Sequence, residues 1–184
     1  MEIDTIKENL YDIWKDLEKL QWIQSIGDSM RPLIGNGSSL ALQFCKSEKI
    51  KLGHIIAFRR GKDTVVHRVI GFWNKDSQVH FIEKGDNNPH CLLVPQEALL
   101  GRIVAIKHGN KILSLKNPFW RILDFLFVIY GWLFTGLFWI LYQIKIVLFG
   151  REKKPWSQWI YRFLMELFLF IPRNLARLLK RIKS

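Results

Sequence analysis

The stretch H-I-I-A-F-R-R-G-K-D-T-V-V-H-R-V-I-G-F, residues 54–72, decides the fold. It contains two runs rich in β-branched and aromatic residues, 54–59 and 64–72, separated by the turn-forming R-G-K-D. Such runs favour strands, because branched and aromatic side chains pack well on a pleated sheet. Two strands joined by a short glycine-containing loop form an antiparallel hairpin. The sequence therefore predicts a β-hairpin with one histidine, His67, in the middle of its second strand.

Further short strands are expected on both sides of this hairpin, with Gly- and Asn-containing turns between several of them. Their predicted bounds are residues 22–26, 39–44, 78–83, 99–107 and 111–115. Short strands at such close spacing are typical of an antiparallel β domain. We therefore expect a mainly β domain over residues 21–118, in which no internal repeat or low-complexity segment is evident.

Charge is unevenly distributed along the 184 residues. Residues 1–118 carry 17 Lys and Arg against 13 Asp and Glu, a net charge of +4, whereas residues 119–184 carry 11 against 3, a net charge of +8. Because the more basic part is also the more aromatic, its composition favours anionic lipid over nucleic acid as a partner. The sequence has no zinc-finger spacing and no basic helix-turn-helix pattern, so we expect no nucleic-acid partner.

The N-terminal residues 1–20 are predicted to form an amphipathic helix over residues 2–20. Apolar side chains recur there at three- and four-residue steps: Ile3, Ile6, Leu10, Ile13, Trp14, Leu17 and Leu20. The helix carries too many charges to cross a bilayer, and its acidic start does not fit a secretory signal peptide. We expect its apolar stripe to pack on the β domain or on a partner.

The two cysteines, Cys45 and Cys91, make no disulfide framework and show no metal-binding spacing. Small buried thiols are the simpler expectation, and a single bridge is the alternative if the domain faces an oxidising compartment. The sequence indicates no cofactor and no metal.

The C-terminal region, residues 119–184, has the composition of a membrane anchor. Residues 122–142 contain a single charge, Asp124, and are long enough to cross a bilayer, which needs about 20 apolar residues. Residues 143–149 extend the run, and Lys145 can reach the lipid headgroups. A buried helical hairpin in a soluble protein is the alternative interpretation.

Two further helices are predicted after this segment. Residues 156–171 are apolar with one polar stripe, which suits an interfacial helix, and residues 173–183 form a basic amphipathic helix. Both patterns favour attachment to a membrane.

The segment S-I-G-D-S-M-R-P, residues 25–32, places Ser29 at a glycine-aspartate turn. A serine on a turn and a histidine on a strand can act as nucleophile and general base if folding brings them within hydrogen-bond reach. Taken alone, Ser29 could be an ordinary turn serine, and His67 a core histidine bonded to backbone. The pair becomes informative in combination with the segments around it.

Several segments occur in the order found in the type I signal peptidases. They are G-D-S-M-R-P (27–32), V-V-H-R-V-I-G (65–71), E-K-G-D-N-N (83–88) and L-G-R-I-V (100–104). A further segment, G-H-I-I-A-F (53–58), is similar to a strand of that family, with His54 in place of an aspartate. Over residues 22–106 the chain resembles the histidine branch of the family, found in archaea and the endoplasmic reticulum, rather than the bacterial branch with a lysine base.

This resemblance implies a coiled, all-β catalytic domain that cuts peptide bonds by acyl transfer. It implies that Ser29 is the nucleophile and His67 the general base, and that the backbone N–H of Ser29 helps to form the oxyanion hole. Met30 and Pro32 would shape the turn and the wall beside the substrate. Asp86 is the candidate carboxylate that orients His67.

The sequence also departs from the family pattern. The family's further aspartate, a few residues after the G-D-N-N loop, has no counterpart in residues 89–92, so Asp86 or Asp28 must orient His67, or the site works as a dyad. Gly27-Asp28 replaces the usual Ser-Gly before the nucleophile, which removes a hydroxyl that often completes the oxyanion hole. The membrane segment follows the β domain, whereas in the family it usually precedes that domain.

Arg68 follows the candidate base on the same predicted strand. Because side chains alternate along a strand, we expect Arg68 on the opposite face from His67, as a structural or surface charge. The remaining histidines, His54, His80, His90 and His108, are expected to be non-catalytic.

We therefore expect a membrane-anchored serine endopeptidase that removes signal or leader peptides from precursor proteins or peptides. Its expected partners are that precursor, membrane lipid and a membrane protein complex. The missing acid and the missing oxyanion serine leave an alternative, a catalytically inactive peptidase fold that binds peptides or acts as a scaffold subunit of a membrane complex. Basic residues flank the apolar segment at both ends, so their distribution does not place the β domain on one side of the membrane.

Overall fold

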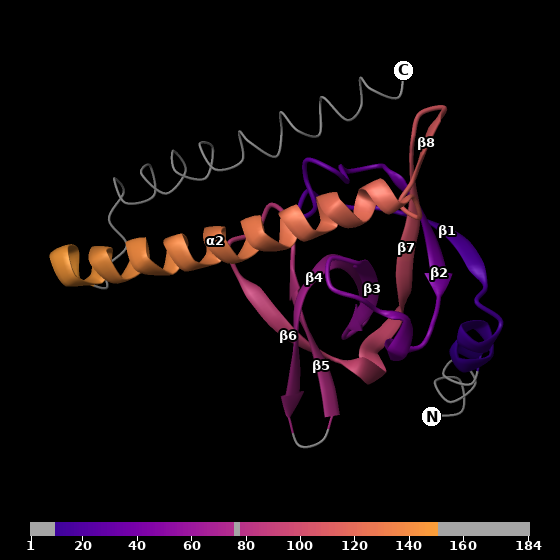
Figure 1. The fold of residues 1–184 in the computed structure, drawn as a ribbon, viewed down its shortest axis with the longest axis horizontal. Coiled ribbons are helices and arrows are strands. Elements are labelled where there is room, and N and C mark those ends of the chain that lie inside the picture. The colour runs from indigo at the N-terminus through magenta and orange to yellow at the C-terminus, as the bar shows by residue number, and fades with distance from the viewer. Residues whose placement is uncertain (1–9, 76–77, 151–184) are drawn as a thin grey trace.

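The computed structural model describes residues 10–75 and 78–150. The predictions for residues 1–9, for the interfacial helix at 156–171 and for the basic helix at 173–183 lie outside the described residues. In the described part, eight strands form one antiparallel sheet that curls into a half-barrel, and a long apolar helix follows it (Figure 1). The mainly β fold class is thus confirmed.

The strands follow one another closely along the chain. They are β1 Leu20–Gln24, β2 Ser39–Phe44, β3 Ile55–Arg60, β4 Asp63–Lys75, β5 Gln78–Lys84, β6 Cys91–Pro95, β7 Leu99–His108 and β8 Lys111–Ser114. Two single-turn 3-10 helices, η1 Ser47–Lys49 and η2 Gln96–Ala98, lie in the connections. The order across the sheet is β1-β2-β7-β3-β4-β5-β6, and β8 pairs with β7.

The predicted hairpin at residues 54–72 is present as β3 and β4. Its pairs run from Ile55 opposite Arg68 to Arg60 opposite Asp63, so the R-G-K-D turn closes it as expected. Along β3, Ile55 and Ala57 belong to one buried cluster while Ile56 and Phe58 belong to another. Because neighbouring side chains point to opposite faces, this alternation shows that both faces of β3 are covered.

The sequence prediction missed β6. This strand pairs only with β5 among the described strands, and its Leu92 and Leu93 are both exposed. Only Val94 of this strand is buried, so the strand has no repeated apolar alternation that would have distinguished it from the loop before it.

The N-terminal helix ends earlier than predicted. Residues 10–16 are helical, and Glu18 then adopts a left-handed backbone conformation with φ of 47°. The next residues pair with β2, from Leu20 opposite Gln43 to Gln24 opposite Ser39. The predicted helix end at residue 20 is therefore wrong. The strand predicted at 22–26 is present, but it begins and ends two residues earlier, because backbone pairing with β2 already begins at Leu20. Tyr11 stacks on Phe44 of β2 with ring centroids 5.9 Å apart, and Trp14 meets the same ring edge-on at 5.0 Å.

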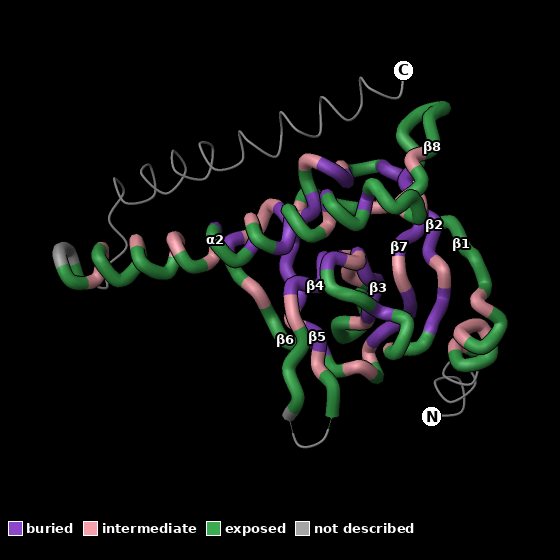
Figure 2. The backbone as a smooth tube through the Cα atoms, viewed as in Figure 1, coloured by how far each residue is buried: buried purple, intermediate pink, exposed green. Residues whose placement is uncertain are grey.

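The long helix is α2, Pro118–Phe149, which begins with the Asn117 side chain accepting a hydrogen bond from the Phe119 N–H. It begins four residues before the predicted segment 122–142 and continues through the predicted extension at 143–149. Residues Pro118–Val147 are long and apolar enough to cross a membrane. Trp120 and Leu123 belong to the main core of the β domain. The start of α2 is thus packed on the sheet, while its far end extends beyond the sheet (Figures 1 and 2).

The contact between α2 and the β domain depends on Gly53. A Cβ on this residue would lie 2.6 Å from the Asp124 Cβ and 3.2 Å from the Asp124 carbonyl carbon, and the Gly53 φ of +86° also disfavours other residues. The helix backbone therefore lies directly against the loop before β3.

Charged side chains are buried beneath α2. Arg68 is fully buried and binds both Asp86 and Asp124. The prediction that Arg68 lies on the opposite face of the strand from His67 is confirmed, and the prediction of a surface charge is wrong. Lys84 is also buried, with its ammonium 4.9 Å from the centre of the Phe134 ring. Removing Asp86 or Asp124 would leave the buried Arg68 charge with one carboxylate fewer, and breaking a buried ion pair in this way typically costs about 3–5 kcal/mol.

Replacing Lys84 with methionine is expected to stabilise the fold, most strongly near neutral pH. Burial lowers the pKa of Lys84 from its ordinary 10.5 to about 8. At pH 7 Lys84 is charged in both the folded and the unfolded chain, and burying that charge lowers the free energy of unfolding. Between the two pKa values the folded chain has already lost the proton that the unfolded chain still binds, so this cost falls with rising pH and is almost gone above pH 10. The stability advantage of Lys84→Met over the native chain should therefore shrink by roughly 3 kcal/mol between pH 7 and pH 10.5.

Denaturant unfolding at several pH values measures this difference. Lys62→Met is the matched control, because Lys62 is exposed and should give no comparable pH dependence. An advantage of Lys84→Met that stays constant across this range would contradict the burial argument.

Candidate active site

Ser29 lies in the connection between β1 and β2, and a second loop, residues 85–88, holds this connection in place. The Asn87 N–H donates to the Ser29 carbonyl oxygen at 2.8 Å, and the Asn87 side-chain amide donates to the Asp28 carbonyl at 3.1 Å. The loop follows β5 directly, so the position of Ser29 depends on the end of that strand.

The predicted pair, Ser29 and His67, is brought together. Ser29 Oγ lies 3.1 Å from His67 Nε2, although the two residues are 38 positions apart in the chain. His67 is 6% exposed on β4 and lies beside the buried Phe58 ring, with ring centroids 6.2 Å apart. A hydroxyl within hydrogen-bond reach of a fixed imidazole is the arrangement that activates a serine nucleophile.

The carboxylate at the second imidazole nitrogen belongs to Glu83. Its Oε2 forms a hydrogen bond with His67 Nδ1, and its Oε1 accepts from Arg60 Nη2 at 2.5 Å. A carboxylate can only accept, so Nδ1 carries the proton and Nε2 is free to accept from the Ser29 hydroxyl. Ser29, His67 and Glu83 therefore form a connected hydrogen-bonded triad.

The sequence prediction did not identify Glu83, although the strand pattern contained a signal for it. In the sheet, Glu83 lies opposite Val69, and Val69 shares a face with His67 because the two are two residues apart on β4. Aligning the two predicted strands as an antiparallel pair would have placed the Glu83 carboxylate near the imidazole.

Asp86 does not orient His67, so its predicted role in the site is wrong. Both of its carboxylate oxygens bind Arg68, at 2.9 Å from Nε and 2.9 Å from Nη2. The other candidate, Asp28, forms an ion pair with Arg31 at 2.7 Å and is half exposed. Asp86 binds the buried Arg68 guanidinium instead, because the two hydrogen bonds of a bidentate pair offset the cost of burying both charges.

Met30 also differs from its predicted position beside the substrate. It is 3% exposed and belongs to the main core cluster, so it supports the Ser29 turn from inside the domain. Pro32 is half-buried in the same connection. No described contact tests its predicted place in a substrate wall.

Gly85 leaves space next to the triad. A Cβ at this position would lie 2.8 Å from the Ser29 carbonyl oxygen and 3.1 Å from His67 Nε2. Any larger residue would therefore press on the imidazole nitrogen that faces Ser29. This close approach explains why a glycine begins the loop after β5.

A second serine–histidine contact has a different character. Ser38 Oγ lies 3.0 Å from His108 Nδ1 and also accepts from the Gly35 N–H at 3.3 Å. Ser38 is 1% exposed, so a substrate carbonyl has no access to its hydroxyl. This contact is structural.

The other titratable groups do not add to the site. Burial, with nearby arginine and lysine charges, lowers the pKa of His54 to about 4, so this histidine is neutral at physiological pH. Cys45 and Cys91 are free thiols, and burial raises the pKa of Cys45. Among the described residues, no group of three or more His, Cys, Asp or Glu side chains is arranged to hold a metal ion.

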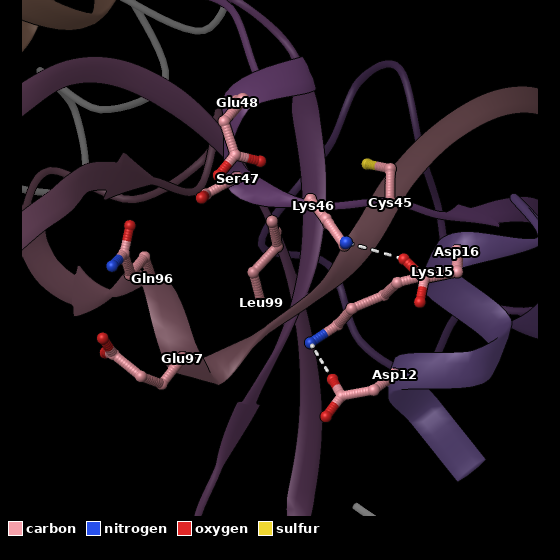
Figure 3. Close-up of a pocket in the computed structure, with 10 residues that line it drawn as sticks. All are labelled: Asp12, Lys15, Asp16, Cys45, Lys46, Ser47, Glu48, Gln96, Glu97 and Leu99. Atoms are coloured by element: carbon pink, nitrogen blue, oxygen red, sulfur yellow. Dashed lines mark hydrogen bonds and ion pairs between the residues drawn. The ribbon is translucent and has the colours of Figure 1, made fainter. Parts of the chain in front are cut away.

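A hollow of about 450 Å³ lies between the N-terminal helix, η1 and η2 (Figure 3). Carboxylates and lysines line it, and they pair with one another as Lys15 with Asp12 at 3.5 Å and Lys46 with Asp16 at 2.7 Å. No member of the triad lines this hollow. Its size therefore does not make it the reacting centre.

Comparison with models of known protein families and with curated proteins found no match.

The assignment of Glu83 can be checked by NMR. In the native chain the His67 Nδ1–H is expected to give a strongly deshielded proton resonance, because it donates to a buried carboxylate. Glu83→Gln should move this resonance far upfield, and Asp86→Asn should leave it close to its native position. Imidazole-labelled protein in detergent provides the measurement. A resonance that responds to Asp86→Asn and not to Glu83→Gln would reverse the assignment.

Proposed function

We propose that the chain is a membrane-anchored serine endopeptidase that removes signal or leader peptides from precursors. The observation that carries the proposal is the connected triad, with Ser29 Oγ 3.1 Å from His67 Nε2 and Glu83 on His67 Nδ1. A serine, a histidine and a carboxylate in this order supply the groups that acyl transfer needs.

The triad supports a two-stage reaction. In the first stage, Ser29 Oγ attacks the peptide carbonyl carbon while His67 Nε2 takes the hydroxyl proton. The C–N bond then breaks, His67 gives that proton to the leaving amine, and the acyl group stays on Ser29 as an ester. In the second stage, water attacks the ester through the same base, which restores the Ser29 hydroxyl and releases the new carboxyl end.

Glu83 acts through the imidazole. Its negative charge stabilises the imidazolium that forms in each stage, and its hydrogen bond keeps the Nδ1–H tautomer. Arg60 holds the second carboxylate oxygen, so the carboxylate orientation is fixed from both sides. We assign part of the oxyanion hole to the backbone N–H of Ser29, which such a mechanism requires beside the attacked carbonyl.

Helix α2 supports a membrane location for this activity. Its residues Pro118–Val147 are long and apolar enough to cross a membrane, and large apolar side chains such as Phe125, Ile129 and Leu133 are exposed along it. An anchor holds the site near the bilayer, which raises the effective concentration of a membrane-bound precursor. The resemblance of the ordered motifs to type I signal peptidases suggests that the bond cut separates a signal or leader segment.

The alternative of an inactive peptide-binding fold depended partly on a missing acid. Glu83 supplies a carboxylate at the required imidazole nitrogen, which favours the catalytic proposal.

Ser29→Ala is expected to abolish cleavage of a leader peptide. Removing the nucleophile should lower kcat at least about 10³-fold, because only substrate binding and the oxyanion hole remain. Detergent-purified protein, a set of leader peptides and detection of both fragments by mass spectrometry give the measurement. Ser114→Ala is the matched control, since Ser114 is exposed and remote from His67 in the sheet.

Glu83→Gln should keep detectable activity but lower kcat by about 10²–10⁴-fold, because the imidazolium loses its counter-charge.

Cutting by Ser29→Ala at the native rate would refute the nucleophile assignment. Intact biological function in cells that carry both Ser29→Ala and His67→Ala would favour the inactive-fold alternative.

A further inference from the structure

Helix α2 does more than lie beside the β domain, because its Asp124 enters the polar network behind the active site. Asp124 Oδ1 accepts from Arg68 Nη1 at 2.6 Å, and the same Nη1 donates to the Gly53 carbonyl at 2.9 Å. Arg68 follows His67 directly in β4. One strand therefore carries the base on one face and the helix contact on the other.

Arg68 also reaches the loop that holds Ser29. Its Nε and Nη2 bind the two oxygens of Asp86, each at 2.9 Å. Asp86 lies between Gly85, which borders His67 Nε2, and Asn87, whose N–H binds the Ser29 carbonyl. The guanidinium therefore fixes the residue at the centre of the loop that sets the distance between nucleophile and base.

The contacts of the Arg68 guanidinium connect α2 with the loop before β3 and with the loop after β5. Arg68 is fully buried, and its Cζ lies 4.6 Å from the centre of the Phe127 ring, about one turn along α2 from Asp124. Gly53 lets the helix backbone approach closely enough for both contacts. An ionisable residue inside an apolar helix is costly unless it has a partner, and here the partner belongs to the catalytic domain.

We propose that Asp124 is a positioning residue: α2, through Asp124 and Arg68, sets the conformation of the 85–88 loop and thereby the Ser29–His67 geometry. This inference rests on the proposed peptidase function. It makes α2 part of the catalytic structure, so that the apolar helix and the triad work as one unit. A helix that served only as a tether would leave the reaction on a detergent-soluble peptide unchanged when Asp124 is altered.

The test compares Asp124→Asn with Asp124→Glu and with Arg121→Gln, an exposed change on the same helix. Each variant is assayed in detergent for kcat and KM on a short leader peptide, and for the rate at which a fluorophosphonate modifies Ser29. Asp124→Asn is expected to lower kcat and the modification rate about 3- to 30-fold, the size usual for coupling between connected residues, with KM within about twofold. Asp124→Glu should recover part of the rate, and Arg121→Gln should behave as native.

A second pair of variants keeps the test decisive if Asp124→Asn does not fold. Phe127→Leu removes the ring under the guanidinium while keeping an apolar side chain, and Phe125→Leu is its control because Phe125 is exposed. Phe127→Leu is expected to lower the modification rate about 2- to 5-fold, within the same range of coupling strengths, and Phe125→Leu to have no effect.

The outcomes separate this inference from the proposed function. Native rates in folded Asp124→Asn and Phe127→Leu would overturn the positioning role while leaving the peptidase proposal intact. A native chain that neither cuts peptides nor reacts at Ser29 would refute the peptidase proposal itself. A fall in rate that matches the fraction of unfolded protein, measured by circular dichroism, would also count against positioning.

Discussion

Side-chain alternation along β4 and β5 is the constraint on which the site and its support depend. Consecutive residues of a strand point to opposite faces, so His67 and Arg68 separate, as do Glu83 and Lys84. Antiparallel pairing then places His67 with Glu83 on one face and Arg68 with Lys84 on the other. The first face carries the hydrogen-bonded triad, and the second carries α2. A shift of either strand by one residue would exchange these faces and destroy both arrangements.

The buried charges explain why the two faces are connected. A fully buried guanidinium is tolerated only when its donors are satisfied, and Arg68 achieves this with two carboxylates and a backbone carbonyl. Those partners come from the loop after β5, the loop before β3 and α2. Their negative charges raise the pKa of Arg68 despite burial, which keeps the network charged. The cost of an unpaired charge thus holds three separate segments in register around the triad.

Much of the fold could be predicted from local pattern. The hairpin of β3 and β4, the position of β2 and the apolar helix all follow from residue type and spacing, and the Ser29–His67 contact followed from the resemblance of the motifs. The prediction that Asp86 orients His67 was wrong for a physical reason. Asp86 and Glu83 are three residues apart, and only the sheet register and the buried Arg68 decide which of them reaches the imidazole.

Other features depend on contacts that are distant in the chain. β6 buries only Val94, so its strand character arises mainly from pairing with β5. The start of α2 looked like part of an anchor, whereas Trp120 and Leu123 complete the core of the β domain. The length and apolar character of a segment do not reveal which of its faces packs on protein. The Gly53 contact with Asp124 is visible only when both segments are placed in space.

The central claim is that Ser29 is a nucleophile activated by His67 and Glu83. The most direct measurement is to mix the protein with a leader-peptide ester, quench in acid within the first turnover, and locate the acyl group by mass spectrometry. The account predicts an acyl ester on Ser29 in the native chain and none in His67→Ala. A folded native chain that hydrolyses the ester with the acyl group on another residue, or with no acyl-enzyme and an unaltered rate in Ser29→Ala, would contradict it.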